Sequence, residues 1–340
     1  MEQLIQTLKE LVNTPSPTGW TKRAEAYLMD TLKGLGYEPW QSNKGTVYVQ
    51  LNPGAEGNGI LLSAHVDTLG LMVRSVKSNG RLRVTTLGGF PLNYAEQENV
   101  VIHTRDGEAI DGTLRLNEPA VHVSRKIGET ERADDNMEIV IDRVVKSKED
   151  TEKLGISAGD YISLDPRFRY TGGFVKSRHM DDKASAAILL ELARRYAETD
   201  TAWKRPVYLM FTMYEEVGHG AAAAHPKGIT DMIAVDMGVI GDDLSCDETK
   251  VSICAKDSTG PYNYDLTHSL VATAKELSLD YAVDIYPYYG SDASAALAAG
   301  YDYRHALIGP GVAASHGYER VHEKGLEQTL RLLEGYLKNA

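Results

Sequence analysis

Residues 205–221 read "RPVYLMFTMYEEVGHGA", and this stretch decides the fold class. The apolar, β-prone run at 205–212 predicts a buried strand. The glycines and alanines after Glu216 predict a turn that opens a helix. In an open α/β sheet, ligands bind just beyond the carboxyl ends of the strands. Glu215 and Glu216 stand at such an end, where two adjacent carboxylates are costly unless a positive group holds them.

The segments on either side of this strand alternate between helices and strands. Helices are predicted over about 2–13, 20–34, 182–198, 264–278 and 323–338, and strands over about 45–51, 59–67, 205–212 and 232–236. The expected buried positions of the long helix are Ala184, Ala187, Ile188, Leu190, Leu192 and Ala193. These elements predict an α/β domain.

The pattern of polar and apolar residues changes between residues 71 and 163. Short segments of alternating polarity are separated there by Asn-Gly and Asp-Gly turns, without a long helix. This pattern predicts a small antiparallel β-barrel. We therefore expect an α/β domain of residues 1–70 and 164–340, interrupted by an all-β insertion at 71–163.

Composition narrows the possible partners and the compartment. The chain has 340 residues and a formal net charge of −12, which argues against binding to nucleic acid or to an anionic membrane. No apolar run approaches membrane-spanning length. The two cysteines, Cys246 and Cys254, form neither a disulfide framework nor a zinc knuckle, so a reducing cytoplasm is expected.

Acidic residues and histidines gather at the ends of four α/β segments. They are His65 and Asp67, Asp181 and Asp182, Glu215 and Glu216, and Asp236, with His316 and His322 near the C-terminus. Each has an ordinary reading alone; Asp181 and Asp182, for example, suit a helix N-cap. Together, converging carboxylates repel one another unless they are protonated or bound to metal.

Mixed histidine and carboxylate ligands suit zinc, cobalt or manganese. One carboxylate shared by two ions, with a histidine and a further carboxylate on each side, makes a two-metal site with ions about 3.5–4 Å apart. Asp67 lies two residues after His65, on the same side of a still-extended strand. Its carboxylate is then placed to accept a hydrogen bond from the imidazole's other nitrogen.

Four motifs in this order, "HVDTLGLMV", "HMDDKASA", "MYEEVGHGA" and "AVDMG", resemble the dinuclear-metal aminopeptidases of metallopeptidase family forty-two. That group contains glutamyl, leucyl and deblocking aminopeptidases and members once described as cellulases. "LGGFP", "VVIHTRDGEAIDG" and "GDYISLD" resemble its inserted, PDZ-like β-barrel, and "GSDASAA" resembles its usual Gly-Thr-Asp-Ala stretch. The resemblance implies a zinc-aminopeptidase-like domain with a central mixed sheet flanked by helices. It also implies homo-oligomers, from dimers to tetrahedral dodecamers, assembled through the barrel.

The resemblance also implies roles by position. His65 and Asp236 would complete one metal site, Glu216 and His316 the other, and Asp181 would bridge them. The metals would be two divalent ions, most simply zinc, with cobalt or manganese as alternatives. Asp67 would orient His65. Glu215 would be the general base that takes a proton from the attacking water and gives it to the leaving amine.

Further expectations concern the surroundings of the site. The peptide bond between Asp181 and Asp182 is expected to be cis, and Asp292 is expected near the substrate's α-amino group. The "ASHGYERVH" segment departs from the family pattern and lacks its proline. His316 is favoured as the last ligand because Glu319 follows shortly after it, with His322 as the alternative. Tyr318 and Arg320 are candidates to line the substrate pocket.

The leading reading is an exopeptidase that removes N-terminal residues from short peptides. The alternative keeps the site but takes blocked, N-acylated dipeptides or amino acids. A glycoside hydrolase is less favoured, because adjacent residues on a strand point apart and the histidines would have no role. A metal-free scaffold protein would have lost a ligand, yet every expected ligand type is present.

Overall fold

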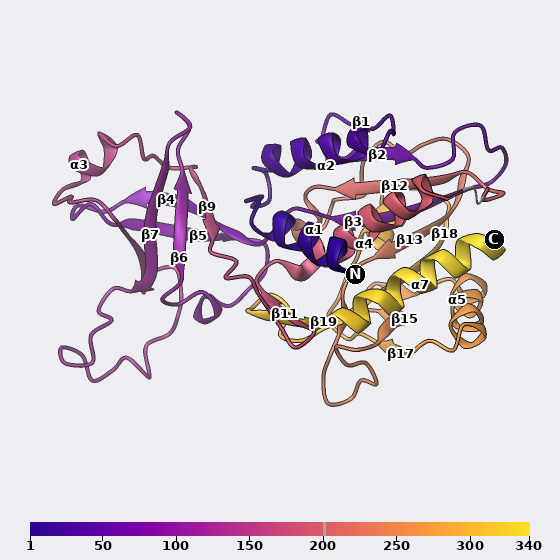
Figure 1. Cartoon of the computed structure of the whole chain (residues 1–340). Coiled ribbons are helices and arrows are strands. Elements are labelled where there is room, and N and C mark those ends of the chain that lie inside the picture. Colours follow the sequence, from indigo (N-terminus) through magenta and orange to yellow (C-terminus); the bar gives the residue numbers. More distant parts are fainter. Residues whose placement is uncertain (200–201) are drawn as a thin grey trace. The chain divides into compact units, whose positions relative to one another are not determined.

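The computed structural model describes residues 1–199 and 202–340 (Figure 1). Two compact units make up the chain: Met1–Asp67 together with Arg167–Ala340, and Thr68–Pro166. Each unit has its own hydrophobic core.

The first unit is built on a ten-stranded sheet. Its main path is β1 (Trp40–Gln41), β2 (Val47–Gln50), β12 (Val207–Thr212), β3 (Gly59–His65), β13 (Ile229–Val235), β18 (Arg304–Val312), β15 (Val251–Asp257) and β16 (Gly260–Pro261), while β14 (Gly238–Val239) pairs with β18 and β17 (Tyr281–Ile285) with β15. Neighbouring strands β12, β3, β13 and β18 run parallel, so their carboxyl ends share one edge. Every residue of β3 is buried, as is usual for a parallel strand covered on both faces.

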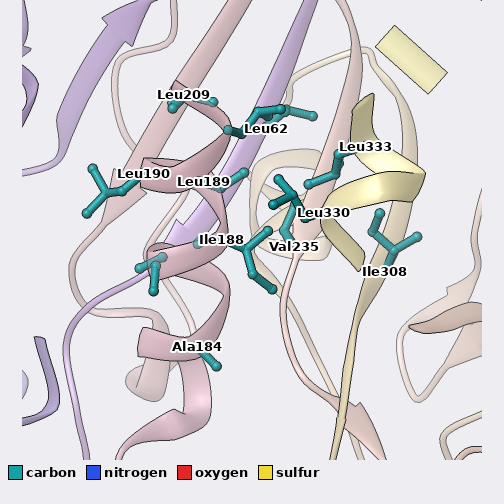
Figure 2. Close-up of a cluster of buried hydrophobic side chains, with 14 of the residues drawn as sticks. Leu62, Ala184, Ile188, Leu189, Leu190, Leu209, Val235, Ile308, Leu330 and Leu333 are labelled. Atoms are coloured by element: carbon teal, nitrogen blue, oxygen red, sulfur yellow. The ribbon is translucent and has the colours of Figure 1, made fainter. Parts of the chain in front are cut away.

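Helices cover this sheet. They are α1 (Glu2–Val12), α2 (Lys22–Gly34), α4 (Met180–Ala197), α5 (Tyr264–Glu276), α6 (Asp292–Ala298) and α7 (Glu323–Asn339). Helix α4 packs against β3, α1 and α7, and all six of its expected buried positions are buried. Figure 2 shows the cluster of buried side chains to which Ile188 of α4 and Leu330 of α7 both belong. Each such leucine or isoleucine contributes about 1.5–3 kcal/mol by its burial.

A three-stranded sheet, β10 (Arg169–Thr171), β11 (Phe174–Ser177) and β19 (Glu319–His322), also belongs to the first unit. Strand β11 pairs with β19 so that Ser177 lies opposite Glu319. The chain then runs from β11 directly into α4. This pairing brings the segment before α4 next to the segment that carries His316.

The second unit is a closed antiparallel barrel, which confirms the sequence prediction. Its strands follow the order β4 (Gly70–Val76), β5 (Leu82–Leu87), β8 (Met137–Ile141), β7 (Ala109–Leu116), β6 (Asn99–His103) and β9 (Tyr161–Leu164), with a short 3₁₀ turn at Leu92–Tyr94 and a short helix, α3, at Lys148–Glu152. Alternate residues, among them Val84, Leu114 and Ile139, fill its interior. Gly80 and Gly107 end the Asn-Gly and Asp-Gly turns with positive φ angles of 83° and 90°.

Two local predictions were wrong, and several elements were missed. The residues after Glu216 open no helix; 218–228 carry no helix or strand. Glu215 and Glu216 lie in a 3₁₀ turn, Glu215–Val217, rather than on an extended strand. Among the missed elements is β18, whose "IGPGV" run reads as a chain breaker. Gly309 is required there, because a Cβ atom would lie 1.8 Å from the carbonyl oxygen of Asp236. None of the described helices is long and apolar enough to span a membrane.

Candidate metal centre

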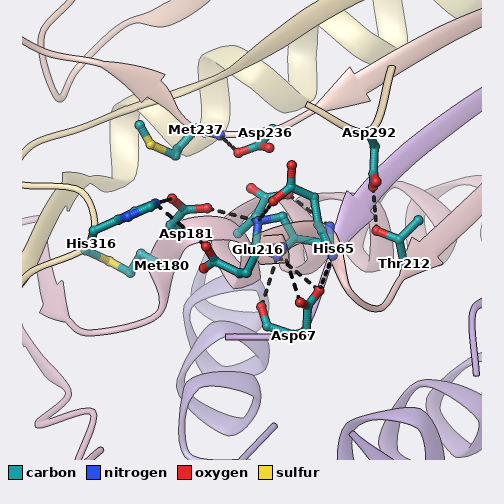
Figure 3. A network of polar contacts seen from close by, with 12 residues as sticks. His65, Asp67, Met180, Asp181, Thr212, Glu216, Asp236, Met237, Asp292 and His316 are labelled. Atoms are coloured by element: carbon teal, nitrogen blue, oxygen red, sulfur yellow. Dashed lines mark hydrogen bonds and ion pairs between the residues drawn. The ribbon is translucent and has the colours of Figure 1, made fainter. Parts of the chain in front are cut away.

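The carboxyl edge of the parallel sheet gathers the residues that the sequence singled out (Figure 3). His65 is the last residue of β3, and Asp236 directly follows β13. Glu215 and Glu216 follow β12 after two residues, and Asp181 lies in the first turn of α4. The pairing of Thr212 with His65 sets the ends of β12 and β3 level. The topology therefore produces the cluster.

Asp181 stands between two histidines. Its Oδ1 lies 3.0 Å from Nε2 of His65, and its Oδ2 lies 3.5 Å from Nε2 of His316. His65 and Asp181 are 1% and 7% exposed. Each oxygen of one buried carboxylate thus faces a different imidazole, the arrangement that a bridging ligand requires.

Glu216 and Asp236 extend the cluster on either side. The Oε2 of Glu216 lies 3.7 Å from Nε2 of His316, and its Oε1 is buried without a hydrogen-bond partner among the described residues. Potential ligand atoms of His65, Asp181 and Glu216 lie within 4.8 Å of one another. The same holds for His65, Asp182 and Asp236.

Asp182 is a residue whose role the sequence analysis missed. Its Oδ2 accepts the backbone N–H of His65 at 3.2 Å, and its Oδ1 is a second buried oxygen without a described partner. From the sequence it reads as a helix N-cap, because an acidic pair before a helix is common. The peptide bond between Asp181 and Asp182 is cis, as expected.

Asp67 contacts His65 in a different way from the one expected. The atom nearest to Nδ1 of His65 is the backbone carbonyl oxygen of Asp67, at 2.9 Å, while the carboxylate Oδ1 lies 3.6 Å away. The carboxylate instead accepts the backbone N–H groups of Glu215 and Glu216, at 3.1 and 3.4 Å, and the hydroxyl of Thr18 at 2.7 Å. Asp67 therefore holds both the imidazole and the turn that carries the two glutamates.

The pKa values of the clustered groups show that their negative charges lack a compensating positive charge. Burial and neighbouring carboxylates raise the pKa values of Glu215 and Glu216 well above the usual range, and raise the pKa of Asp236 to about 7. Burial alone would lower the pKa of His65, but Glu215, Asp181 and Asp236 together raise it. A protein with these groups alone takes up protons to relieve the repulsion. Divalent cations relieve it equally, and the unpartnered oxygens of Glu216 and Asp182 suit them.

The backbone is bent sharply at three places in the site. His179, Tyr214 and His316 have φ angles of 67°, 71° and 65°. Residues with a Cβ atom seldom adopt this left-handed region, which costs of order 1–3 kcal/mol each. These bends immediately precede the Asp181 and Glu215 turns, or carry the ligand candidate itself. The strain is concentrated where side chains must converge.

Glu319 is a second residue whose role was missed. Its Oε2 accepts the backbone N–H groups of Met180 and Asp181 at 2.7 and 3.2 Å, and its Oε1 accepts that of His316 at 3.1 Å. Burial, with Asp181 nearby, raises its pKa to about 8. One carboxylate therefore ties the Asp181 turn to the His316 loop.

Asp292 does not line the cavity beside the cluster. Its Oδ1 accepts the backbone N–H of Ala221 at 2.8 Å, and its Oδ2 accepts the hydroxyl of Thr212. A Cβ atom on Gly220 would lie 2.4 Å from Oδ1, so the glycine is needed for this approach. Burial raises the pKa of Asp292 to about 6. Asp292 supports the loop after the glutamates, and its expected contact with a substrate amine stays a prediction.

That loop is held in place by side chains. Lys44 donates to the carbonyl oxygens of His219, Gly220 and Ala222. His225, Tyr301 and Tyr48 contact those of Ala221, Ala223 and Ala224. Six consecutive carbonyl groups thus have a side-chain partner, although the loop has no regular structure.

The two candidates for the last metal ligand, His316 and His322, lie in different surroundings. His316 faces Asp181, whereas His322 accepts the backbone N–H of Lys324 and caps α7. Tyr318 donates to the carbonyl oxygen of Arg167, and Arg320 stacks its guanidinium over Phe174. Neither residue lines the cavity beside the cluster.

A cavity of about 420 Å³ opens beside the cluster. Its lining includes Asp181, Glu215, Glu216, Asp236 and His316. Thr259 and residues from the 288–298 segment also line it. Histidines and carboxylates gathered next to a cavity of this size make a candidate active site for a small substrate.

Comparisons with known proteins define the class first. The chain is 43% identical over 340 residues to "Putative aminopeptidase YhfE" of Bacillus subtilis (strain 168), covering 100% of this chain and 98% of that protein. It is 26% identical over 287 residues to glutamyl aminopeptidase of Lactococcus lactis subsp. cremoris (strain MG1363), covering 82% and 78%. The fold matches the solved TET1 peptidase of Pyrococcus horikoshii with a TM-score of 0.86 at 23% identity, covering 98% of each chain. These matches identify a hydrolase of peptide bonds.

The family follows from a family model. The model described as M42 glutamyl aminopeptidase matches residues 45–332. The chain belongs to that family. The resemblance expected from the four sequence motifs is confirmed, as is the predicted α/β fold with an inserted small barrel.

Proposed function

We propose that this protein is a metal-dependent aminopeptidase that removes N-terminal residues from short peptides at a dinuclear centre. The observation that carries the proposal is the position of Asp181, whose two oxygens face His65 and His316 at 3.0 and 3.5 Å. His65 and Asp236 complete one site and Glu216 and His316 the other. Two zinc ions are the simplest occupants, and cobalt or manganese suit the same ligands.

Bound metal ions would polarise the scissile carbonyl group and make the attacking water more acidic. Glu215 is the proposed general base, because it lies at the cavity with its Oε2 3.6 Å from Nε2 of His65. Its carboxylate accepts a proton from water and returns it to the leaving amine, a role that contributes about 10²–10⁴-fold to the rate. Asp67 holds the backbone of Glu215 in the required place.

A free amino terminus is the preferred substrate feature in this proposal. The relatives described above carry aminopeptidase names, which favours this reading over hydrolysis of N-acylated substrates. We also propose a homo-oligomer, since the Pyrococcus horikoshii TET1 peptidase is described as assembling into a tetrahedron or a large octahedral shell. The barrel unit is the proposed contact element. A cytoplasmic location is proposed on the two buried, unpaired cysteines.

Two glutamine variants test the assignment. Glu215→Gln should keep two metal ions per chain and lose about 10²–10⁴-fold in kcat. Glu216→Gln should bind less than two ions, because it loses a ligand. Glu198→Gln, at an exposed glutamate paired with Arg194, is the matched control.

The measurements are metal content by mass spectrometry and hydrolysis of a free and an N-acetylated form of one dipeptide. Near-normal turnover by metal-loaded Glu215→Gln would show that the base is wrongly assigned. Preference for the acetylated form would overturn the aminopeptidase reading. Solution mass at several concentrations tests the oligomer, and a monomer throughout would contradict it.

A further inference from the structure

Hydroxyl and methyl groups form part of the lining of the cavity beside the metal cluster, together with Tyr288 and Tyr289. Ser291, Ser294, Ala295 and Ala298 recur at the spacing of one helix face, so α6 and its N-cap residue present only small side chains to the cavity. Thr259 joins them from the turn after β15. The small side chains leave room, and the hydroxyl groups decide the polarity of the wall.

A buried carboxylate lies behind this wall. Asp257, the last residue of β15, is 0% exposed. Its Oδ1 accepts the N–H and the hydroxyl of Thr259 at 2.7 and 2.6 Å. Its Oδ2 accepts the hydroxyls of Tyr262 and Ser294 at 2.7 and 3.1 Å. The neighbouring Lys256 donates to the backbone carbonyl of Asp257.

This arrangement fixes the direction of the hydroxyl protons. A hydroxyl group has one proton to donate and two lone pairs that accept. Thr259 and Ser294 donate their protons to Asp257 and their hydroxyl oxygens lie 3.0 Å from each other, so the lone pairs that remain are available to a ligand in the cavity. The negative charge of Asp257 adds to the same polarity. The Thr259 and Ser294 hydroxyls therefore present acceptors rather than donors to the cavity.

Apart from His316 and the proposed metal ions, the cavity lining offers no source of positive charge. Every residue that lines it is among those the structure describes, and none is a lysine or an arginine. A side-chain carboxylate placed against the Thr259 and Ser294 hydroxyls would meet acceptor oxygens backed by Asp257, with no lysine or arginine in the lining to pair with it. An ammonium or guanidinium group at the same place could donate hydrogen bonds to the hydroxyl oxygens of Thr259 and Ser294.

We propose that the Thr259–Ser294 wall, polarised by Asp257, selects N-terminal residues whose side chain ends in a hydrogen-bond donor. Lysine and arginine are the best substrates in this class, and glutamate and aspartate the worst. The proposal rests on the proposed aminopeptidase function and names its substrate class. Thr259 and Ser294 are the specificity residues, and Asp257 is a positioning residue that acts through them.

Binding of free amino acids tests this without requiring turnover. L-lysine, L-norleucine and L-glutamate have side chains of similar length that are cationic, neutral and anionic. On the zinc-loaded protein, titration calorimetry should give lysine a Kd about tenfold lower than norleucine, as one charge-assisted hydrogen bond provides. Glutamate should bind more weakly than norleucine. Glutamate binding as tightly as lysine would overturn the proposal.

Variants test whether the preference for lysine over norleucine depends on Asp257, Thr259 and Ser294. In Asp257→Asn the amide takes the place of one acceptor oxygen, so the lysine-to-norleucine ratio should fall to near one. Asp247→Asn is the matched control, because Asp247 accepts the N–H and hydroxyl of Thr249 in the same local turn at 2.8 and 2.6 Å. Its ratio should be unchanged. If Asp257→Asn does not fold, Thr259→Val with Ser294→Ala should give the same loss, and an unchanged ratio there would contradict the proposal.

Kinetics separate this proposal from the function on which it rests. Lysyl, norleucyl and glutamyl anilides should show the same order in kcat/KM. If the free amino acids bind in the expected order but no anilide or peptide is cleaved, the aminopeptidase function fails and the specificity wall stands. If all three anilides are cleaved with equal kcat/KM, the function stands and the wall is wrong.

Discussion

Asp67 provides the sharpest test of how the site is held, because its carbonyl and its carboxylate have different tasks. The carbonyl oxygen meets Nδ1 of His65 at 2.9 Å, and the carboxylate accepts the N–H groups of Glu215 and Glu216. Asp67→Ala removes only the carboxylate. Asp67→Asn keeps one acceptor oxygen at the same position. Both variants leave the contact with the imidazole in place.

The expected sizes follow from these contacts. Asp67→Ala leaves two N–H groups without an acceptor, at about 1–3 kcal/mol each, or about 2–6 kcal/mol of stability. In Asp67→Asn the amide oxygen keeps the 3.1 Å bond to Glu215, and the Thr18 hydroxyl reverses to accept from the amide. Only the long 3.4 Å bond to Glu216 is lost, which leaves one N–H group without an acceptor at about 1–3 kcal/mol.

Turnover should follow the same order. A displaced Glu215 lowers kcat by about 10²-fold in Asp67→Ala, as misplacement by about 1 Å does. Asp67→Asn should stay within about tenfold of the parent protein. The assay is kcat on an amino-acid anilide at saturating zinc, with urea unfolding of the same samples and their metal content.

One result would refute this reasoning. If the carboxylate itself orients His65, an amide in its place presents the wrong partner to the imidazole and lowers kcat by about 10⁴-fold, as in the serine protease triad. Asp67→Asn would then be as inactive as Asp67→Ala, or more so. Equal loss in both variants, with metal still bound, would return the carboxylate to the role that the sequence predicted.

Two further predictions concern the metals. Glu319→Gln weakens the tie between Asp181 and His316, so zinc affinity measured by chelator competition should fall about 10–100-fold; unchanged affinity would show that the tie is dispensable. In chelated protein, folded Asp236 and Asp292 have pKa values of about 7 and 6, above their ordinary 3.8. The folded state therefore binds more protons than the unfolded chain between about pH 4 and 7, and its stability falls as the pH rises through that range. Thermal melting at pH 5 and pH 7 should show lower stability at pH 7 without metal, and zinc should remove the difference; a higher melting temperature at pH 7 in chelated protein would contradict this.

The strands that carry the site could be predicted because parallel strands buried on both faces leave continuous apolar runs. The runs before His65 and before Asp236 end at a polar residue, and the structure ends β3 and β13 at or beside those residues. Long helices such as α4 could also be predicted, because their alanines and leucines recur at the spacing of a buried helix face. The convergence of the site followed from this topology alone.

The contacts within the site were not predictable in the same way. Which atom of Asp67 meets His65 depends on the chain leaving its extended form after His65, and the period of a strand does not report that. Asp257 ends β15, a strand that the sequence analysis did not assign. Helix α6 has seven residues, mostly alanine, so it shows no hydrophobic period. These features depend on tertiary partners far away in the sequence.

The conformation of the alanine-rich loop after Glu216 depends on side chains from other parts of the sequence. Its own side chains are mostly methyl groups, while the groups that fix its carbonyls come from Lys44, Tyr48 and Tyr301. These residues lie on segments that precede and follow the loop by many tens of positions. Substitutions at Lys44, Tyr48 or Tyr301 would therefore change the conformation of the loop without changing its own sequence. The conformation of the loop is therefore set mainly by residues outside it, and Lys44, Tyr48 and Tyr301 do not line the cavity beside the cluster.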